Sequence, residues 1–425
     1  MKKKKNNTPV STQPVDFEKH YGEDGKIWSI GNHKNGKRDG LWKFYDKGLL
    51  VSEGHFKNGR ENGLWKWYEK ELLVSEINYK NGLKDGLYKS YSSNRAVYQE
   101  HHCKNGMLDG SFKAYYDTGK LKYEGNYCAD QRVGPWKEYH SNGQLRSEYS
   151  CENGKMEGPY IEYFENGALL CKVNYKNNVR DGSYTTYYDT GILKCEGNFH
   201  NGKKEGLWKL YTKNGTLDIE GNYQNDMMEG LCKGYYDNGQ LKETDNYIHD
   251  QLNGMCQEYY NNGRLKQETN YQNNKKNGPY KAYDDQGNLL REGSYQNDKK
   301  NGLCKIYYTN GKLKEQSHFD NDIANGPSQG YYETGTLKYI GNYQADKANG
   351  FWKDYYDNGN LEREGNYKAG KADGFWKFYY ESGNLKCAGN YVKGKCEGRW
   401  ENYDKNKNLE QVVHYKAGKP TTSSK

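Results

Sequence analysis

The stretch Gly110-Ser-Phe-Lys-Ala-Tyr-Tyr-Asp-Thr-Gly-Lys-Leu-Lys-Tyr-Glu-Gly-Asn-Tyr127 recurs with small changes along most of the 425-residue chain. Its first glycine returns after 23 residues twice and after 24 residues from then on. A period of about 20–50 residues indicates a solenoid or an array of one small unit. We count positions from this glycine, which is place zero of each unit. The sixteen units begin at Gly40, Gly63, Gly86, Gly110, Gly134, Gly158, Gly182, Gly206, Gly230, Gly254, Gly278, Gly302, Gly326, Gly350, Gly374 and Gly398.

The composition excludes both an ordinary globular core and a disordered chain. Only 33% of residues are hydrophobic and 51 are glycine, and the mean hydropathy is −1.27. The 44 tyrosines and nine tryptophans are nevertheless far too many for a disordered chain. A repeat array resolves this conflict, because each unit buries a little surface against its neighbours.

Each unit contains two turn signals. The first lies at places eight and nine, as in Asn238-Gly239, and the second at places nineteen and twenty, as in Asn201-Gly202. Asn-Gly favours a type I′ turn, since both central residues of that turn need positive φ. We therefore predict an all-β fold: an elongated, single-sheet array of antiparallel β-hairpins. The two 23-residue units each lack one residue at the first turn.

The chain divides into three parts. Residues 1–20 have no period and are interpreted as a disordered basic arm, residues 21–415 as the continuous array, and residues 416–425 as a polar tail. The net charge is +8, but basic and acidic residues alternate, so no specific nucleic-acid binding is expected. No apolar segment is long enough for a transmembrane helix or a secretory signal, which predicts a cytoplasmic protein.

The turn positions also predict the pairing within a unit. A two-residue turn at places eight and nine pairs place six with eleven, two with fifteen, and zero with seventeen. Aromatic rings at places two and seventeen would then cover exposed backbone at the glycines of places fifteen and zero, which lie across from them. The opposite face would pair lysine at place three with glutamate at place fourteen, as Lys353 with Glu364. Tyrosine at place five would lie beside place twelve, as Tyr115 beside Lys122.

Residues 21–415 resemble MORN repeats, and more closely the bacterial MORN repeat variant. The segment Gly350-Phe-Trp-Lys-Asp-Tyr-Tyr-Asp-Asn-Gly-Asn-Leu-Glu-Arg-Glu-Gly-Asn-Tyr367 matches nearly every defining place of the variant. The resemblance implies an array of β-hairpins that acts as a protein-binding scaffold. It further implies contact with membrane phospholipids in some members and an antitoxin role for many bacterial ones.

Place two supplies the candidate binding residues. Its rings either pack against one another and the glycines or form a groove for the side chains of a partner. Smaller residues occupy this place in the middle of the chain, where they would leave a bend or a recess. The aromatic candidates are Trp136, Trp208, Tyr280, Trp352 and Trp376, and the recess candidates are Cys232, Cys256, Cys304 and Ser328.

No catalytic site, metal site or cofactor is predicted. Gly326-Pro-Ser-Gln-Gly330 matches a nucleophile elbow, but no helix follows it. His101 and His102 are adjacent and would point to opposite faces of a strand. Asp320-Asn-Asp322 starts like a calcium loop, but the ligand spacing does not continue. The ten cysteines contain no C-x-x-C pair and mostly share columns with apolar residues, so we expect free, packed thiols.

These observations favour a non-enzymatic scaffold that binds another protein along its length, with an antitoxin-type inhibitor as one form of it. Two other classes stay open. Lys2, Lys3, Lys4 and Lys5 would give weak contact with anionic lipid, although the glutamates among the lysine columns oppose polybasic attraction. Aromatic hairpins of similar length also bind choline or carbohydrate, although the 24-residue period favours the scaffold.

Overall fold

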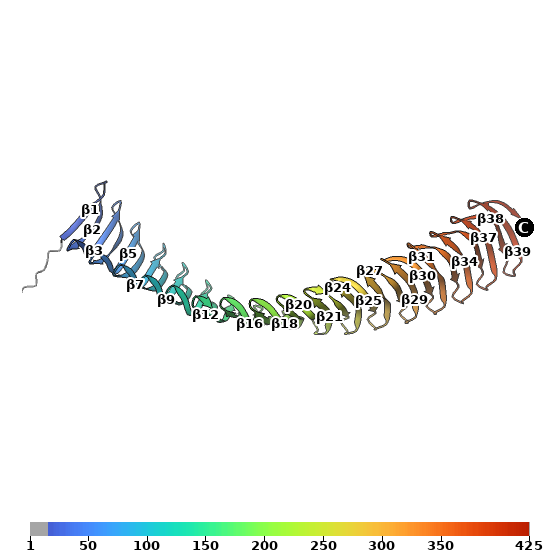
Figure 1. The fold of residues 1–425 in the computed structure, drawn as a ribbon, viewed down its shortest axis with the longest axis horizontal. Helices are drawn as coiled ribbons and strands as arrows, with labels where there is room; N and C mark the ends of the chain where they lie inside the picture. Colours follow the sequence, from blue (N-terminus) through green and yellow to red (C-terminus); the bar gives the residue numbers. More distant parts are fainter. Residues whose placement is uncertain (1–15, 425) are drawn as a thin grey trace, which may run out of the picture. The chain divides into compact units, whose positions relative to one another are not determined.

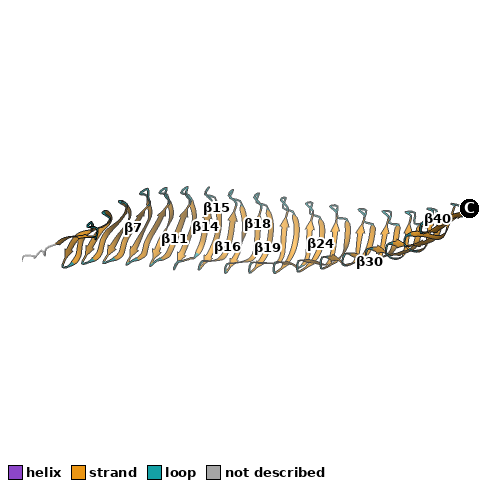
Figure 2. Cartoon of the chain, turned by 90° about the horizontal axis from the view of Figure 1, so that it is seen from above, coloured by secondary structure: helices purple, strands orange, loops and turns teal. Residues whose placement is uncertain are grey.

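The computed structural model describes residues 16–424, and all regular secondary structure there is β (Figure 2). Lys2, Lys3, Lys4 and Lys5 lie outside the described residues. The chain divides into two compact segments of many repeats each. The first reaches Glu205 and the second starts at Gly206, except that Lys213–Gly215 belong with the first. Within each segment, neighbouring strands pair antiparallel and form a single open layer (Figure 1). The all-β hairpin array is therefore confirmed.

Among the described residues, the first compact segment contains seventeen complete strands. They are β1 (Asp16–Tyr21), β2 (Ile27–Lys34), β3 (Lys37–Asp46), β4 (Leu49–Lys57), β5 (Arg60–Glu69), β6 (Leu72–Lys80), β7 (Leu83–Tyr91), β8 (Val97–Lys104), β9 (Met107–Tyr115), β10 (Leu121–Cys128), β11 (Gln131–Tyr139), β12 (Leu145–Glu152), β13 (Lys155–Met156), β14 (Gly158–Tyr163), β15 (Leu169–Lys176), β16 (Val179–Tyr187) and β17 (Leu193–His200).

The remaining strands lie in the second compact segment, apart from the first three residues of β18. They are β18 (Lys203–Tyr211), β19 (Leu217–Gln224), β20 (Met227–Tyr235), β21 (Leu241–Ile248), β22 (Gln251–Leu252), β23 (Gly254–Tyr259), β24 (Leu265–Gln272), β25 (Lys275–Tyr283), β26 (Leu289–Gln296), β27 (Lys299–Lys300), β28 (Gly302–Tyr307), β29 (Leu313–Asp320), β30 (Ile323–Tyr331), β31 (Leu337–Gln344), β32 (Lys347–Ala348), β33 (Gly350–Tyr355), β34 (Leu361–Lys368), β35 (Lys371–Ala372), β36 (Gly374–Tyr379), β37 (Leu385–Val392), β38 (Lys395–Tyr403), β39 (Leu409–Lys416) and β40 (Lys419–Ser424).

The array extends beyond its predicted boundaries at both ends. Strand β1 lies partly within the region interpreted as a disordered arm, and it pairs with β2. Strand β40 lies within the predicted polar tail and pairs with β39. The physical reason is that an end strand exposes a row of unpaired backbone groups, which a neighbouring segment can satisfy without sharing the repeat pattern.

The first turn differs from the prediction in the 24-residue units. The His140 N–H donates to the Gln144 carbonyl and the Gly143 N–H donates to the His140 carbonyl, both at 2.8 Å. Gly143 has positive φ, as expected for a three-residue loop that joins a type I turn to a left-handed residue. Place five therefore pairs with place eleven, as Tyr139 with Leu145, and place twelve lies in a bulge. The predicted pairing of place six with eleven is wrong.

The predicted two-residue turn occurs elsewhere. In the 23-residue unit that begins at Gly40, Lys47 and Gly48 both have positive φ and connect paired residues of β3 and β4. At the second turn, Asn58 and Gly59 likewise have positive φ and connect β4 to β5. Loss of one residue thus converts the three-residue first turn into a type I′ turn.

The predicted pairs of place zero with seventeen, two with fifteen and three with fourteen are confirmed. In the unit that begins at Gly350, that glycine pairs with Tyr367, Trp352 with Gly365, and Lys353 with Glu364. Alternation along the strands therefore separates two faces. We call the face with places two, four, thirteen, fifteen and seventeen the ring face, and the face with places one, three, five, fourteen and sixteen the polar face.

In the described part of the chain, six tryptophans of the ring face cover a glycine of the preceding repeat, not of their own. A Cβ atom added to Gly365 would meet the Trp376 ring at well under 3.0 Å. The Trp376 indole N–H also donates to the Asn366 carbonyl beside that glycine, at 3.1 Å. The same close approach is found for the pairs Gly31–Trp42, Gly54–Trp65, Gly125–Trp136, Gly341–Trp352 and Gly389–Trp400.

The place-zero glycines have a different role from the one predicted. All sixteen have positive φ. In strand β11, Lys137 pairs with Glu124 and Val133 with Asn126, so the three residues from Gly134 to Trp136 lie opposite the single residue Gly125 of β10. Gly134 is thus a bulge glycine, and most other residues would be strained in its backbone conformation. It does not lie beneath a ring.

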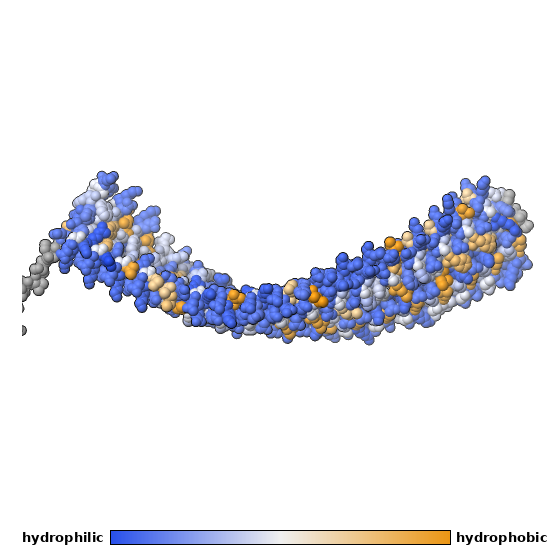
Figure 3. Space-filling view, in the orientation of Figure 1, coloured by the Kyte–Doolittle hydropathy of each residue, from blue (hydrophilic) through white to orange (hydrophobic). Residues whose placement is uncertain are grey.

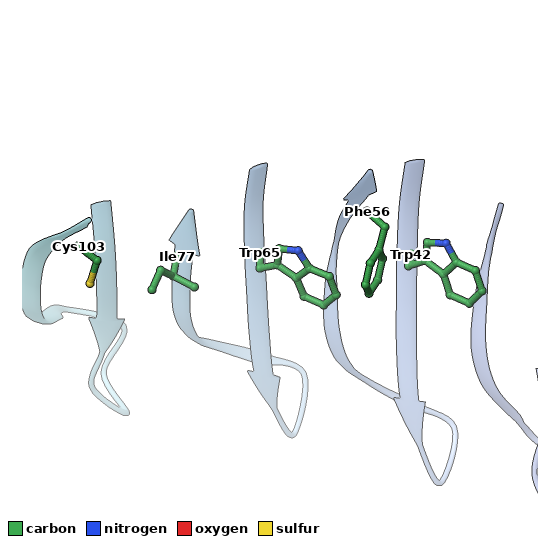
Figure 4. Packing of buried hydrophobic residues seen from close by; sticks show 5 residues of the cluster. All are labelled: Trp42, Phe56, Trp65, Ile77 and Cys103. Atoms are coloured by element: carbon green, nitrogen blue, oxygen red, sulfur yellow. The ribbon is translucent and has the colours of Figure 1, made fainter. Parts of the chain in front are cut away.

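The core is a row of side chains on the ring face. Figure 4 shows one such cluster, formed by Trp42, Phe56, Trp65, Ile77 and Cys103. The Phe56 ring lies edge-on to Trp42 and Trp65, with ring centroids 6.1 and 5.0 Å apart. Each unit therefore buries its aromatic rings against the rings of its neighbours in sequence, as the low content of aliphatic residues requires.

Candidate functional site

The predicted aromatic candidates form part of the core. Trp136, Trp208, Tyr280, Trp352 and Trp376 are all buried on the ring face. Trp376, for example, lies edge-on between Tyr367 and Tyr391 at centroid distances of 5.0 and 6.1 Å. These rings pack against one another and the glycines, so they do not form an open groove. The surface available to a partner lies mainly on the polar face.

The polar face carries a ladder of hydrogen bonds between neighbouring repeats, which is interrupted where place fourteen is not glutamate, as at Ile340 and Ala388. The Tyr379 hydroxyl donates to Glu364 Oε1 at 2.9 Å, and Lys353 Nζ lies 3.4 Å from Glu364 Oε2. Tyrosine at place five thus binds the glutamate at place fourteen of the preceding unit, while lysine at place three approaches the same carboxylate. The same Tyr–Glu bond links Tyr68–Glu53, Tyr91–Glu76, Tyr115–Glu100, Tyr139–Glu124, Tyr163–Glu148, Tyr235–Glu220, Tyr283–Glu268 and Tyr307–Glu292.

The predicted contact between Tyr115 and Lys122 is wrong. The Tyr115 hydroxyl donates to Glu100 Oε1 at 2.8 Å. Lys122 Nζ instead lies 5.4 Å from the centre of the Tyr116 ring. The cause is the bulge at place twelve, which displaces this lysine from the pairing that a two-residue turn would give.

The tyrosine ladder predicts a specific alkaline transition. Burial and, after it, the hydrogen bond to Glu364 raise the pKa of Tyr379 to about 12, and the pKa of Tyr307 is raised to about 12 by burial and its bond to Glu292. The unfolded value is about 10, so this stabilisation is complete below about pH 10 and is lost as the pH rises towards 12. We expect tyrosinate absorbance of the folded chain to appear at higher pH than that of the chain in urea. Coincident titration curves would contradict the prediction.

A column of exposed apolar side chains accompanies this ladder. Phe351 and Phe375, both at place one, are 49% and 51% exposed. Phe351 pairs with Asn366 and so lies on the polar face, two residues from Lys353. Other large exposed side chains at place one are Leu41, Leu64, Leu207, Leu231 and Leu303. Figure 3 shows apolar residues as separate patches within a mainly hydrophilic surface.

The recess candidates divide into different environments. Cys256 is buried and lines a cavity of about 220 Å³ together with Glu243, Asp245 and Glu258. Ser328 is buried, and its Oγ lies 2.7 Å from Ser317 Oγ. Cys304 is buried and Cys232 is half-buried. The cavity at Cys256 is therefore lined by three carboxylates.

Tryptophan at place two follows a glycine at place fifteen of the preceding unit, as in Gly365–Trp376, whereas tyrosine also follows larger residues, as in Val173–Tyr184. The atoms nearest to a Cβ added at Gly221 belong to Cys232 and Met228, whereas Asp245 stands at the place before Cys256. We expect Cys232→Trp to raise the free energy of unfolding by about 0.5–2 kcal/mol, because the ring can cover the glycine. Cys256→Trp should lower it by about 1–3 kcal/mol, because Asp245 occupies the corresponding space. Urea unfolding checks both, and equal effects would contradict the rule.

The remaining sequence motifs are explained by packing and turns. Ser328 of the nucleophile-elbow match is buried in a strand. The His101 ring stacks on Tyr88 at 4.5 Å, and burial lowers the pKa of His101 to about 4. Asp322 Oδ1 accepts a hydrogen bond from the Lys300 N–H at 2.7 Å, which ties one turn to the preceding unit. All ten cysteines are free.

The structure also assembles a cluster that the sequence interpretation missed. Glu18, His20 and His33 place one ligand atom each within 4.8 Å of one another. The period-two spacing of Glu18 and His20 is a strand signal that could have been noticed. It was missed because residues 1–20 were interpreted as disordered, so no strand partner was considered for them.

Comparison with family models identifies the repeats. The model described as MORN repeat variant matches thirteen segments, which together cover well over half of the chain. They are residues 108–129, 132–155, 156–177, 180–201, 204–225, 228–249, 252–273, 276–297, 300–321, 324–345, 349–369, 372–393 and 397–417.

Solved structures with similarity to the chain include large toxin assemblies. The chain is 11% identical to the TcdB2-TccC3-Cdc42 crystal structure, covering 95% of this chain and 25% of that one, with a TM-score of 0.15. It is 12% identical to the Tc holotoxin pore of Photorhabdus luminescens, covering 96% and 26%, with a TM-score of 0.15. The chain thus spans about a quarter of these chains.

No curated protein matches the chain. Within residues 16–424, no helix has the length and apolar character needed to cross a membrane. The family match agrees in period and position with the hairpin units of the structure. The chain therefore belongs to the MORN repeat variant family.

Proposed function

We propose that this repeat scaffold is a non-enzymatic protein that binds another protein through its polar face. The observation that carries the proposal is the exposed column at place one, above all Phe351 and Phe375, beside the ordered Tyr–Glu–Lys ladder. Exposed apolar side chains surrounded by polar groups are typical of protein-binding surfaces. The opposite face uses its rings for its own core, so it offers fewer free apolar groups.

The spacing of the column indicates the kind of partner. Equivalent residues of successive units are separated by two strands, which corresponds to about 10 Å. A partner that contacts several units at this spacing gains avidity without any single strong contact. We favour an extended or repetitive partner, and an antitoxin-type inhibitor would be one protein of this kind. We also propose a cytoplasmic location, which fits ten unpaired cysteines.

The two alternatives have less support. Contact with anionic lipid depends on Lys2, Lys3, Lys4 and Lys5, which lie outside the described residues. Recognition of choline or carbohydrate by the place-two rings requires open ring faces, whereas rings such as Trp136 and Trp376 are buried.

The test is affinity isolation of the tagged full-length chain from its native cell, with two matched double variants. Phe351→Ser/Phe375→Ser removes two place-one side chains, and Ile248→Ser/Val392→Ser removes two side chains that are each 49% exposed beside second turns. We expect a stoichiometric protein partner that the first variant loses and the second retains. Equal retention by both variants, or recovery of lipid or glycan without protein, would overturn the proposal.

A further inference from the structure

We propose that Glu18, His20 and His33 form a binding site for a divalent transition-metal ion of the zinc class. Glu18 and His20 are two residues apart on β1 and therefore point to the same side of the sheet. Strand β2 pairs antiparallel with β1, and His33 lies opposite Asp16. His33 is thus the diagonal neighbour of Glu18, with its side chain on the same face.

The distances fit a tetrahedral ion. Glu18 Oε2 lies 3.0 Å from His33 Nδ1 and 3.4 Å from His20 Nε2. Zinc–ligand bonds of about 2.0–2.1 Å place neighbouring ligand atoms about 3.3–3.4 Å apart. All three ligand atoms already lie within 4.8 Å of one another, so small rotations of the side chains would complete three of the four corners. The fourth corner would hold water or a group from a partner.

The surroundings orient the two imidazoles. The Trp42 ring stacks on His20 at 5.9 Å and lies edge-on to His33 at 5.0 Å. Trp28 lies against the His20 ring as well, at 5.6 Å. Rings held in this way lose less freedom on binding an ion than rings on a mobile chain.

The His33 Nδ1 atom is buried and makes no hydrogen bond, and Glu18 Oε2 lies 3.0 Å from it as an ion-pair partner. A metal ion bound by both atoms would replace this contact and would neutralise the Glu18 carboxylate. The Arg38 guanidinium, 4.6 Å from the centre of the Trp42 ring, opposes cation binding and should limit the affinity.

The ligand set defines the class of ion. Two imidazole nitrogens and one carboxylate suit Zn²⁺, Co²⁺, Ni²⁺ and Cu²⁺, whereas Mg²⁺ and Ca²⁺ prefer oxygen ligands alone. Among the described residues, β1 pairs only with β2. A bound ion would therefore link this strand to the rest of the array through side chains in addition to backbone hydrogen bonds.

The site can be tested with the full-length chain after removal of metal by a chelator. We expect titration calorimetry with ZnCl₂ to show one ion bound per chain, and Co²⁺ to give the absorption of a four-coordinate complex. Glu18→Gln and His33→Ala should each weaken Zn²⁺ binding by at least about tenfold. His55→Ala, which changes an exposed histidine on β4, should have no effect.

A second measurement guards against loss of folding in the variants. The Glu18 side chain is 45% exposed, so Glu18→Gln should leave the circular dichroism spectrum unchanged. Zinc should slow amide hydrogen exchange in β1 and β2 of the unsubstituted chain but not of Glu18→Gln. Absence of stoichiometric uptake, or equal Zn²⁺ affinity for the unsubstituted chain and a folded Glu18→Gln variant, would overturn the proposal.

Discussion

Replacement of Trp376 with alanine should lower the free energy of unfolding of its part of the array by about 3–5 kcal/mol. The Trp376 ring is 2% exposed, covers Gly365, contacts Tyr367 and Tyr391, and donates its indole N–H to a backbone carbonyl. Its loss would expose the backbone at Gly365 and leave a cavity between two tyrosine rings. Because each unit contacts only its sequence neighbours, the effect should be concentrated in β34, β36 and β37.

The adjacent residue is the matched control. Phe375 precedes Trp376 in β36 but points to the opposite face and is 51% exposed. Phe375→Ala should change stability by no more than about 0.5 kcal/mol. Urea unfolding gives the size of each effect, and amide hydrogen exchange gives its location. Similar losses for the two variants would show that the ring face is not the core.

Gly341→Ala should lower the free energy of unfolding by about 1–3 kcal/mol. A Cβ atom at this position would overlap the Trp352 ring at well under 3.0 Å, so the ring or a strand must move. The control is Gly221→Ala at the same place of another unit, where the nearest atom is Cys232 Sγ at 3.3 Å. We expect that variant to be neutral or slightly stabilising, since alanine restricts the unfolded chain more than glycine does.

A double variant shows whether the ring is the cause. Gly341→Ala combined with Trp352→Cys reproduces the small residue found at place two in the unit of Cys232. The two substitutions should be strongly non-additive, because the alanine no longer meets a ring once the tryptophan is gone. Additive losses in urea unfolding would instead mean that Gly341 is required for backbone conformation alone.

The family assignment bears on function only in part. Membership in the MORN repeat variant family accounts for the hairpin array, but a fold does not by itself fix a function. The proposal of a protein-binding scaffold rests on the exposed place-one column, and the proposed metal site rests on Glu18 and His20, which precede the predicted array, and on His33 in strand β2. The two proposals therefore stand or fall separately.

The sequence by itself determined the repeat, the two turns per unit, and the pairs that lie within one hairpin. Lys353 and Glu364, or Trp352 and Gly365, pair as expected because both residues are fixed relative to the same short turn. Local turn chemistry and period-two alternation are sufficient for such pairs. The sequence was insufficient at the first turn itself, where the glycine closes a three-residue loop and moves place twelve into a bulge.

Only the tertiary structure decided how successive units contact one another. Because the units are nearly identical, the sequence cannot show whether a glycine is covered by the ring of its own unit or by the ring of the next unit. For the same reason, the sequence did not predict the hydrogen bond from Tyr379 to Glu364 of the preceding unit. The bulge at each place-zero glycine sets that offset, since it adds two residues to one strand and none to its partner. The pairing of β1 with β2, and with it the cluster of Glu18, His20 and His33, depends on contacts outside the repeat pattern.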